Sequence, residues 1–480
     1  MEEVDPRDVR IAQLEAQVAA RDARIAQLEA QVKALTHRVA ELEARLRKNS
    51  TNSSKPPSSD PPGTQRTSRA PKGKGRRPGG QPGHEPHKRE LLPAEQVDET
   101  IELPPPEKCK GCQRELVGTQ QEVMRHQVVE IPPLKPVVTE YRCQGLKCAH
   151  CGEVNRAELP PEVAGQTFGE RLSAMACLLV GKYRMSKRLV QDALSDLVGV
   201  RLSLGAVHNR EQEMSEALEV AVQEAEEYVR NQDAVHMDET SWLEGKVWGR
   251  CRLVWLWLVA CAQVAVFRIS TSHGSEVAKA LLGEDFAGFL TTDRWSAYNW
   301  YDTALRQVCW SHLTRDFQSF IDRGGEGGRI GQKLMDQRNR MFDWWHRVRD
   351  GTMAREEFER RMGEVEHEVG QLLREAVAHA EKEIAGRAAE ILKLEDALWT
   401  FVHVEGLEPT NNFAERLLRH AVLYRKTSFG TQSPEGSRFV ERILTAVTTL
   451  ELQGRNVLEF LTELLRAHRR GLPTPSLLPT

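Results

Sequence analysis

A stretch rich in serine, proline and glycine, residues 49–93, divides this chain into two parts that must fold separately. It has almost no large apolar side chains, so it cannot bury enough surface to offset the entropy of ordering its backbone. We therefore expect a flexible linker there. Its basic residues include Lys72, Lys74, Arg76 and Arg77. Such an arm can neutralise DNA phosphates without reading sequence, although a merely solubilising tether explains the composition almost as well.

Residues 1–48, before the linker, repeat apolar side chains in heptads. Their a positions are mostly β-branched and their d positions are mostly leucine, which favours a parallel two-stranded coiled coil. Position a holds Ile11, Val18, Ile25, Val32, Val39 and Leu46, and position d holds Leu14, Leu28, Leu35 and Leu42. The pattern predicts a dimerisation helix and hence a homodimer. A single helix packed on the surface of the body is the alternative.

The remaining composition narrows the class of protein. A length of 480 residues allows about three domains. The net charge of −3 is close to zero, so any affinity for nucleic acid must come from local basic patches. The most apolar stretch, residues 253–269, is shorter than a membrane span and contains Gln263 and Arg268. With no signal peptide in view, we expect a cytoplasmic protein whose nine cysteines are thiols or metal ligands rather than disulfides.

Two CxxC pairs lie in residues 94–160, which we expect to form a zinc-binding β module. The pairs are Cys109 with Cys112 and Cys148 with Cys151. Paired knuckles of this kind place four thiolates around a tetrahedral zinc ion. The spacer between the pairs is longer than in usual zinc ribbons, and Cys143 is a competing ligand, so free thiols stay open as the alternative. With all four positions filled by protein, the zinc would be structural.

Residues 161–232 follow a helical pattern that resembles a DNA-binding helix-turn-helix. Two amphipathic stretches flank a short turn with glycine, and the second is expected to start near Ser203. In such a motif the second helix enters the major groove of DNA. His208, Asn209 and Arg210 would then be available to the groove. A helical hairpin that only packs in the core is an equally good interpretation.

Three acidic residues stand in settings that a fold can bring together. Asp238 and Asp293 each follow an apolar, strand-like run, and Glu415 opens a helix. A charged residue at the end of a buried strand needs a partner or an ion. Carboxylate oxygens suit Mg²⁺, and two such ions about 4 Å apart can promote in-line phosphoryl transfer. The cluster therefore predicts a polynucleotidyl transferase that cuts and joins DNA, with surface salt bridges and helix caps as the alternative.

The order of elements around these acids predicts a ribonuclease-H-like catalytic domain in a multidomain α+β chain. We expect an antiparallel meander of three strands, then a helix over 275–282 and the strand that leads to Asp293. His312 opens a later helix, where it could touch a phosphate, although a buried, hydrogen-bonded histidine is the commoner case. The expected parts are a first catalytic segment (233–319), a helical insertion (320–405), a second catalytic segment (406–470) and a tail (471–480).

Taken with these features, the chain resembles the DDE-type transposases of the insertion-sequence-66 family. The resemblance spans nearly the whole chain and rests on motifs in a fixed order. They are KNSTNSSKPPSSD at 48–60, GGQPGHE at 79–85, the two CxxC pairs, MDET at 237–240, TTDRWSAY at 291–298, CWSHLTRDF at 309–317, and NNFAERLLR at 411–419 followed by RKTSFGTQSPEG. Such an ordered set is far more specific than any one motif.

The resemblance implies a bacterial, cytoplasmic protein, held at the nucleoid when bound to DNA, that cleaves and transfers the ends of its element. Asp238, Asp293 and Glu415 would form the DDE triad that holds two Mg²⁺ ions. Accessory proteins of the same element are further implied partners. Implied DNA contacts around the last acid are Asn411, Asn412, Arg416, Arg425 and Lys426. One departure is visible, because Arg294 and Trp295 follow the second Asp where such families usually have Gly and Tyr.

Two other classes of protein fit the same residues. A metal-dependent nuclease would use the same carboxylates and let water attack without a later attack by a 3′-hydroxyl. A catalytically idle DNA-binding regulator would keep the fold without the chemistry, but the complete triad argues against it. The residues alone do not separate cutting from joining.

Overall fold

The structure is a computed structural model that describes residues 17–18, 21–36, 38–39, 89–119, 124–247 and 250–479. Outside these ranges lie the four linker residues predicted to meet DNA, Lys72, Lys74, Arg76 and Arg77. The described residues of the heptad segment are helical, and the apolar side chains of Ile25, Val32 and Leu35 are more than half exposed in the single chain. The coiled coil and the homodimer therefore stay predictions.

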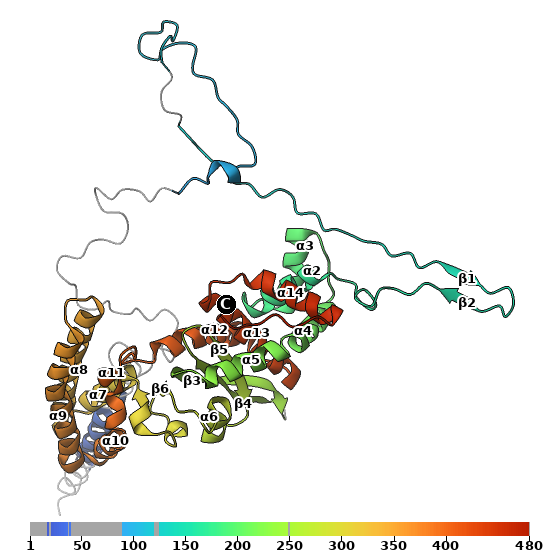
Figure 1. Ribbon diagram of the computed structural model, residues 1–480. Coiled ribbons are helices and arrows are strands. Elements are labelled where there is room, and N and C mark those ends of the chain that lie inside the picture. Colours follow the sequence, from blue (N-terminus) through green and yellow to red (C-terminus); the bar gives the residue numbers. More distant parts are fainter. Residues whose placement is uncertain are drawn as a thin grey trace, which may run out of the picture.

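A mixed five-stranded sheet lies at the centre of the body (Figure 1). Its strand order is β5-β4-β3-β6-β7, in which β3, β4 and β5 are antiparallel and β6 and β7 run parallel to β3. This order confirms the predicted meander. The strands are β3 (Ala234–Val247), β4 (Arg250–Ala260), β5 (Ala265–Ser270), β6 (Phe289–Thr292) and β7 (Arg306–Val308).

The central strand β3 is longer than the sequence predicts. The sequence places Asp238 after a strand-like run, whereas the antiparallel pairing of β3 with β4 continues to Val247 past one register shift. Its parallel pairing with β6 stops where His236 lies opposite Thr291. Asp238 therefore lies inside β3, just past the end of its parallel half, at the edge of the sheet where β6 also ends.

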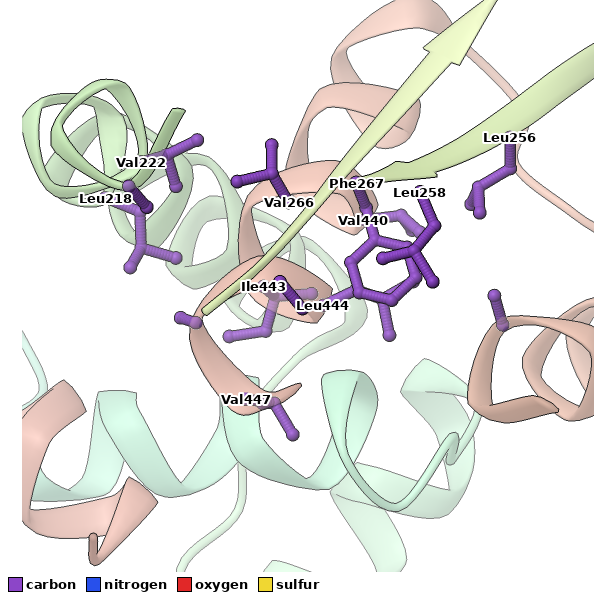
Figure 2. Close-up of a cluster of buried hydrophobic side chains, with 14 of the residues drawn as sticks. Leu218, Val222, Leu256, Leu258, Val266, Phe267, Val440, Ile443, Leu444 and Val447 are labelled. Carbon is purple, nitrogen blue, oxygen red and sulfur yellow. The ribbon is translucent and has the colours of Figure 1, made fainter. Parts of the chain in front are cut away.

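The edge strand β5 is covered by helix α13 (Pro434–Leu452). Figure 2 shows Ile443 and Leu444 of this helix in one buried cluster with Phe267 of β5. The hydroxyl of Thr449 accepts a hydrogen bond from the Ala265 main-chain N–H over 3.1 Å and donates one to the Ala265 carbonyl over 3.0 Å. The helix thus satisfies backbone groups that an edge strand would otherwise leave open to other chains.

The helices before the sheet pack against helices that follow it in the sequence. Helix α2 packs against α14, and α4 packs against α13, so segments before and after the sheet share one hydrophobic core. The predicted helix start near Ser203 is confirmed, because its side chain caps α4 by accepting from the Ala206 N–H. These helices are α2 (Glu170–Gly181), α3 (Lys187–Val198), α4 (Leu204–Ala217), α5 (Glu219–Arg230), α6 (Ser275–Leu282), α12 (Asn412–Ser428) and α14 (Val457–Arg470).

The helices between the last strand and α12 have a hydrophobic core of their own. Helix α7 packs against α8. The core also includes Val308, at the end of β7. Met341 and Trp345 are buried in it, while Trp344 is half-buried. Among the helices described, none is long and apolar enough to cross a membrane. The helices of this part are α7 (Trp310–Arg323), α8 (Gly325–Arg349), α9 (Arg355–His379), α10 (Lys382–Leu392) and α11 (Thr400–His403).

The segment with the two CxxC pairs has much less β structure than predicted, and in Figure 1 it runs away from the body. The described stretch 124–142 contains no strand, and its Val137 is 94% exposed. Proline cannot donate to a β ladder, which explains the loss of pairing. The interrupting residues are Pro132, Pro133 and Pro136. The described strands are β1 (Gly145–Lys147) and β2 (Val154–Arg156), which pair antiparallel.

Candidate active site

The three predicted acids lie at one edge of the sheet. Asp238 lies in β3, Asp293 follows the last residue of the neighbouring strand β6, and Glu415 lies in the first turn of α12. Adjacent parallel strands end at the same edge, where ligands of open sheets bind. The charges of Asp293 and Glu415 both act on Asp238, and that of Asp293 acts on Glu415. The structure thus brings together the acids that the sequence singles out.

The helix that carries Glu415 is fixed to β3 on both sides. Before its first turn, the side-chain amide of Asn411 donates to the Met237 carbonyl over 2.7 Å. After its last turn, the main-chain N–H of Thr431 donates to the Leu243 carbonyl over 2.9 Å. The position of the third acid therefore depends on hydrogen bonds between segments that are far apart in the sequence.

Burial raises the pKa of all three carboxyl groups. For Asp238 burial is the largest cause, and the charges of Glu239, Asp293 and Glu415 add to it. Burial is also the largest cause for Asp293 and for Glu415. A divalent cation would relieve this repulsion, and carboxylate oxygens are the donors that Mg²⁺ prefers. The chemistry of the donor set therefore fits Mg²⁺.

Positive groups and a main-chain N–H oppose the effect of burial on the pKa of Asp293. The Trp295 main-chain N–H donates to Asp293 Oδ1 over 2.8 Å, and the charges of Arg306, Arg294 and Arg315 also lower its pKa. Arg306 is fully buried and donates to the Asp293 carbonyl over 2.8 Å; burial lowers its pKa to about 10, which leaves it charged at neutral pH. Arg315 makes neither a hydrogen bond nor an ion pair with any residue that the structure describes. Its guanidinium is thus available to a phosphate.

The surface beside Asp293 is hollowed by about 420 Å³, and we call this the arginine-lined hollow. Asp316 lies in its wall and pairs with Arg294, with 3.0 Å between Oδ2 and Nε, and with Arg387 of α10 at 3.7 Å. The helical insertion therefore supplies part of the wall. Three arginines and two aspartates line it, so positive groups outnumber the carboxylates, which suits a phosphate backbone. The lining residues are Asp293, Arg294, Trp295, His312, Arg315, Asp316 and Arg387.

A second group of possible metal donors adjoins the third acid. The ligand atoms of Cys309, His312 and Glu415 lie within 4.8 Å of one another. His312 Nδ1 lies 3.8 Å from Glu415 Oε1 and makes no hydrogen bond within the described residues. Burial, with the charges of Arg315 and Arg294, lowers the pKa of His312 to about 3. Its imidazole is thus neutral and able to bind a cation, while its predicted contact with a phosphate stays a prediction.

Sequence reasoning missed a polar group next to the first acid. The hydroxyl of Tyr298 donates to Glu239 over 2.5 Å, and His273 Nε2 lies 3.1 Å from the other oxygen of Glu239. Burial, as the largest cause, and the charge of Asp293 raise the pKa of Glu239 to about 8. The signal was present, because Glu239 and Tyr298 lie in the motifs MDET and TTDRWSAY that contain Asp238 and Asp293.

The residues predicted to enter a DNA groove lie on α4 and differ in exposure. His208 and Asn209 are exposed, and their DNA contacts stay predictions. Arg210 donates to Gln166 over 2.7 Å and pairs with Glu213 at 2.8 Å, and only 13% of its side chain is exposed. Its guanidinium is therefore used inside the protein, which argues against the predicted groove contact of Arg210.

The residues predicted to contact DNA around Glu415 also divide into two groups. Asn411 is 1% exposed, and besides the bond to β3 its main-chain N–H donates to Cys309 Sγ over 3.1 Å. The Arg425 guanidinium donates to the carbonyl and the hydroxyl of Ser241. Asn411 is therefore buried and bonded to β3, which argues against its predicted DNA contact, and the Arg425 guanidinium already has partners inside the protein. The exposed members of the set are Asn412, Arg416 and Lys426.

The two CxxC pairs form matching knuckles. Hydrogen bonds from main-chain N–H groups lower the pKa of Cys109, and the N–H of Cys112 has the largest effect. In the same way the main-chain N–H of Cys151 is the largest cause of the lowered pKa of Cys148. This favours the thiolate, the form that binds zinc. Within the described residues, the four sulfurs do not form a group with ligand atoms inside 4.8 Å. Each knuckle has the donors that zinc requires, and the shared fourfold site stays a prediction.

Comparison with known proteins places these features in a family. Residues 167–438, more than half of the chain and the range that holds all three acids, match the family described as "Transposase IS66 family". Residues 3–90 match a family of unknown function, DUF6444. The "Uncharacterized protein y4qI" of Sinorhizobium fredii is 24% identical over 413 residues, which cover 79% of this chain and 74% of that protein. The predicted resemblance is confirmed, and the chain belongs to the IS66 family of transposases, DNA-processing enzymes with a function in transposition.

Proposed function

We propose that this protein is a DDE transposase that binds the ends of its element and catalyses magnesium-dependent cleavage and strand transfer of DNA. One observation carries the proposal: Asp238, Asp293 and Glu415 come from separate segments and meet at one sheet edge beside the arginine-lined hollow. Membership of the family supports it. The carboxylates supply metal donors, and the arginines supply the positive surface that a DNA strand requires.

The sheet supports a ribonuclease-H-like catalytic core. Three antiparallel strands are followed by two parallel ones in the order β5-β4-β3-β6-β7, with the first acid in the central strand and the second after its parallel neighbour. The third acid lies on a helix after the helical insertion. This is the order of elements from which the sequence predicts a ribonuclease-H-like fold.

The chain's own residues hold the reacting groups in place. Asp238, Asp293 and Glu415 would hold two Mg²⁺ ions, which supply activation of the attacking oxygen and stabilisation of the leaving one. The Trp295 N–H fixes the orientation of the Asp293 carboxylate, and Arg306 fixes the main chain of the same residue. Rigid placement of this kind raises the reaction rate, because moving a reacting group by about 1 Å can lower the rate about 100-fold.

The arginine-lined hollow would bind the backbone of the reacting strand. Arg315 has no partner within the described residues and faces Asp293 and Glu415 closely enough to lower the pKa of both. Arg294 and Arg387 are held by Asp316 at the wall. Fixed guanidinium groups recognise phosphate with two parallel hydrogen bonds and cost little entropy on binding.

The other parts of the chain would select and pair the DNA ends. His208 and Asn209 on α4 are exposed for a groove, and a zinc-bound CxxC module would present its hairpin β1–β2 to the duplex. The basic linker would add contacts that do not depend on sequence. The N-terminal heptads would pair two chains so that two ends are cut together.

A strand-transfer assay tests the proposal. Purified protein is incubated with Mg²⁺, labelled DNA that carries the element's own ends, and an unlabelled target, beside the variants Asp238→Ala and Asp343→Ala; Asp343 is an exposed residue of α8. We expect joined products with the wild type and with Asp343→Ala and none with Asp238→Ala. Cleavage without joining would show that the protein is a nuclease and not a transposase. End binding with neither cleavage nor joining would contradict the proposed catalytic activity.

A further inference from the structure

An aromatic column stands next to the second acid. The ring of His273 lies between two indole rings, with its centroid 3.5 Å from that of Trp255 and 4.4 Å from that of Trp295. The interplanar angles are 4° and 18°, so the three rings are nearly parallel. We call Trp255, His273 and Trp295 the aromatic column. Its last ring belongs to the residue that departs from the family pattern after Asp293.

The last ring of the column is held from several sides. The indole N–H of Trp295 donates to the His273 carbonyl over 3.2 Å, and its main-chain N–H donates to Asp293 Oδ1 over 2.8 Å. His273 itself is held by Glu239 at 3.1 Å, and Glu239 accepts from Tyr298. A tryptophan fixed in this way has already lost the side-chain entropy that binding would otherwise cost.

The same ring is open to solvent at the arginine-lined hollow. Trp295 is 40% exposed and lines the hollow together with Asp293, Arg294 and Arg315. A tryptophan that only packs in a core would be covered, as Trp242, Trp257 and Trp310 are elsewhere in the chain. An exposed, rigid indole surrounded by guanidinium groups combines a stacking surface with positive charge, which is how proteins bind single-stranded nucleic acid.

We propose that Trp295, supported by His273 and Trp255, stacks on an unpaired nucleobase of the DNA strand whose backbone passes through the arginine-lined hollow. The inference rests on the proposed function and names the form of its substrate at this site. Only an unpaired base exposes a full face, because bases inside a duplex are covered by their neighbours. The base next to the reacting phosphate would be unstacked when the strand enters, and the column would stabilise it there.

The contact between Trp295 and Asp293 gives the stacking a consequence for the reaction. A base on the indole would place its phosphate beside the acid whose carboxylate the Trp295 main chain orients. Trp295 is thus a residue that touches substrate, whereas Glu239 and Tyr298 act through His273 and are positioning residues. The column therefore links recognition of an unpaired base to alignment of the phosphate.

Fluorescence of 2-aminopurine tests the proposal. Full-length protein is mixed, without divalent metal, with duplexes that carry the element's end and a single 2-aminopurine at successive positions across the cleavage site. The variants are Trp295→Ala, Trp295→Leu and Trp295→Phe. Leucine keeps apolar cover on His273 but has no π face, whereas phenylalanine keeps one. Leu253→Ala is the control, since Leu253 is 55% exposed on β4 outside the hollow.

We expect emission at one position to be quenched by the wild type, by Leu253→Ala and by Trp295→Phe, and to be restored by the alanine and leucine variants. Binding of a single-stranded end should weaken about 10-fold in those two variants, within the range for one stacked base. Equal emission profiles in the wild type and in Trp295→Leu would overturn the inference. If the inference fails in this way but the wild type still cuts and joins its ends with Mg²⁺, the proposed function is retained. A wild type that does not bind its ends would contradict both the inference and the proposed function.

Discussion

Asn411 and Met237 are joined by a hydrogen bond of 2.7 Å, in which the side-chain amide donates to the main-chain carbonyl. The bond connects the start of the helix that carries Glu415 with the strand position that precedes Asp238. Asn411 Oδ1 lies a further 3.0 Å from His236 Nδ1 on the same strand. One buried asparagine therefore sets the distance between the first and the third acid.

Replacing Asn411 by alanine should slow DNA cleavage about 10- to 100-fold with little loss of end binding, because the third acid loses its connection to β3. It should also lower the free energy of unfolding by about 1–3 kcal/mol, since the Met237 carbonyl is left buried without a donor. Single-turnover cleavage and urea unfolding measure the two effects. Asn339→Ala, an exposed asparagine on α8, is the control and should change neither. An unchanged cleavage rate in Asn411→Ala would refute the positioning role.

Arg315 should control the pH at which the carboxylates bind metal. Its charge lowers the pKa of Glu415 and of Asp293, against the larger effect of burial. In Arg315→Ala both pKa values rise, so the midpoint of Mn²⁺ binding against pH should move upward. Affinity at high pH should not fall, because repulsion between the guanidinium and the metal is lost as well. Arg315→Lys keeps the charge and should keep the midpoint near that of the wild type. Equal midpoints in all three proteins would exclude the effect.

Glu441 on α13 should make stability depend on pH away from the site. Burial raises its pKa to about 7, against an ordinary value of 4.5. The folded state then keeps the proton at pH values where the unfolded chain releases it. The contribution to stability is fully present below about pH 4.5 and is lost as pH rises to about 7, with a span of about 3 kcal/mol.

The substitution Glu441→Gln isolates this contribution, because the amide is neutral at every pH. Urea unfolding should show that the wild type loses stability relative to Glu441→Gln between about pH 5 and pH 8. The exposed Glu463 pairs with Arg466 at the surface, so Glu463→Gln should give no such difference. A constant difference between the wild type and Glu441→Gln across this window would contradict the raised pKa.

The sequence predicts the local elements of this protein better than its long-range contacts. The helix over 275–282 and the strand that leads to Asp293 are found as expected, because periodicity and turn residues are local signals. The role of Asn411 could not be predicted, since its partner Met237 is far away in the sequence. The partners of Arg210 could not be predicted for the same reason, because only the fold brings Gln166 to its guanidinium. The β module predicted over 94–160 has no strand over 124–142, where three prolines cannot donate to a ladder.

The CxxC knuckles should share one zinc ion. Cys109 and Cys148 each have a lowered pKa from main-chain N–H groups, so both knuckles present thiolate. We expect metal analysis of the purified protein to give one zinc per chain, and Cys109→Ser and Cys148→Ser to lose it to the same degree. Cys177→Ser is the control, because Cys177 is buried in the main core and is not part of either knuckle. Zinc retained by Cys148→Ser would show that the knuckles do not share an ion.

The heptad helix should be the dimer contact. Its apolar stripe includes Ile25, Leu28 and Val32, which are 52%, 43% and 62% exposed in the single chain, and a second copy in register would cover them. Light scattering should report a dimer for the full chain and a monomer for the double variant Leu28→Lys and Leu35→Lys, whose charges would face each other across the seam. The matched control, Glu29→Lys and Lys33→Glu, exchanges the charges of two neighbours on the same helix without changing an a or d position.

The lysine variant should still bind a single transposon end but should fail to hold two ends together, because each end is bound by its own chain. A dimer that survives the two lysines would place the contact elsewhere in the protein.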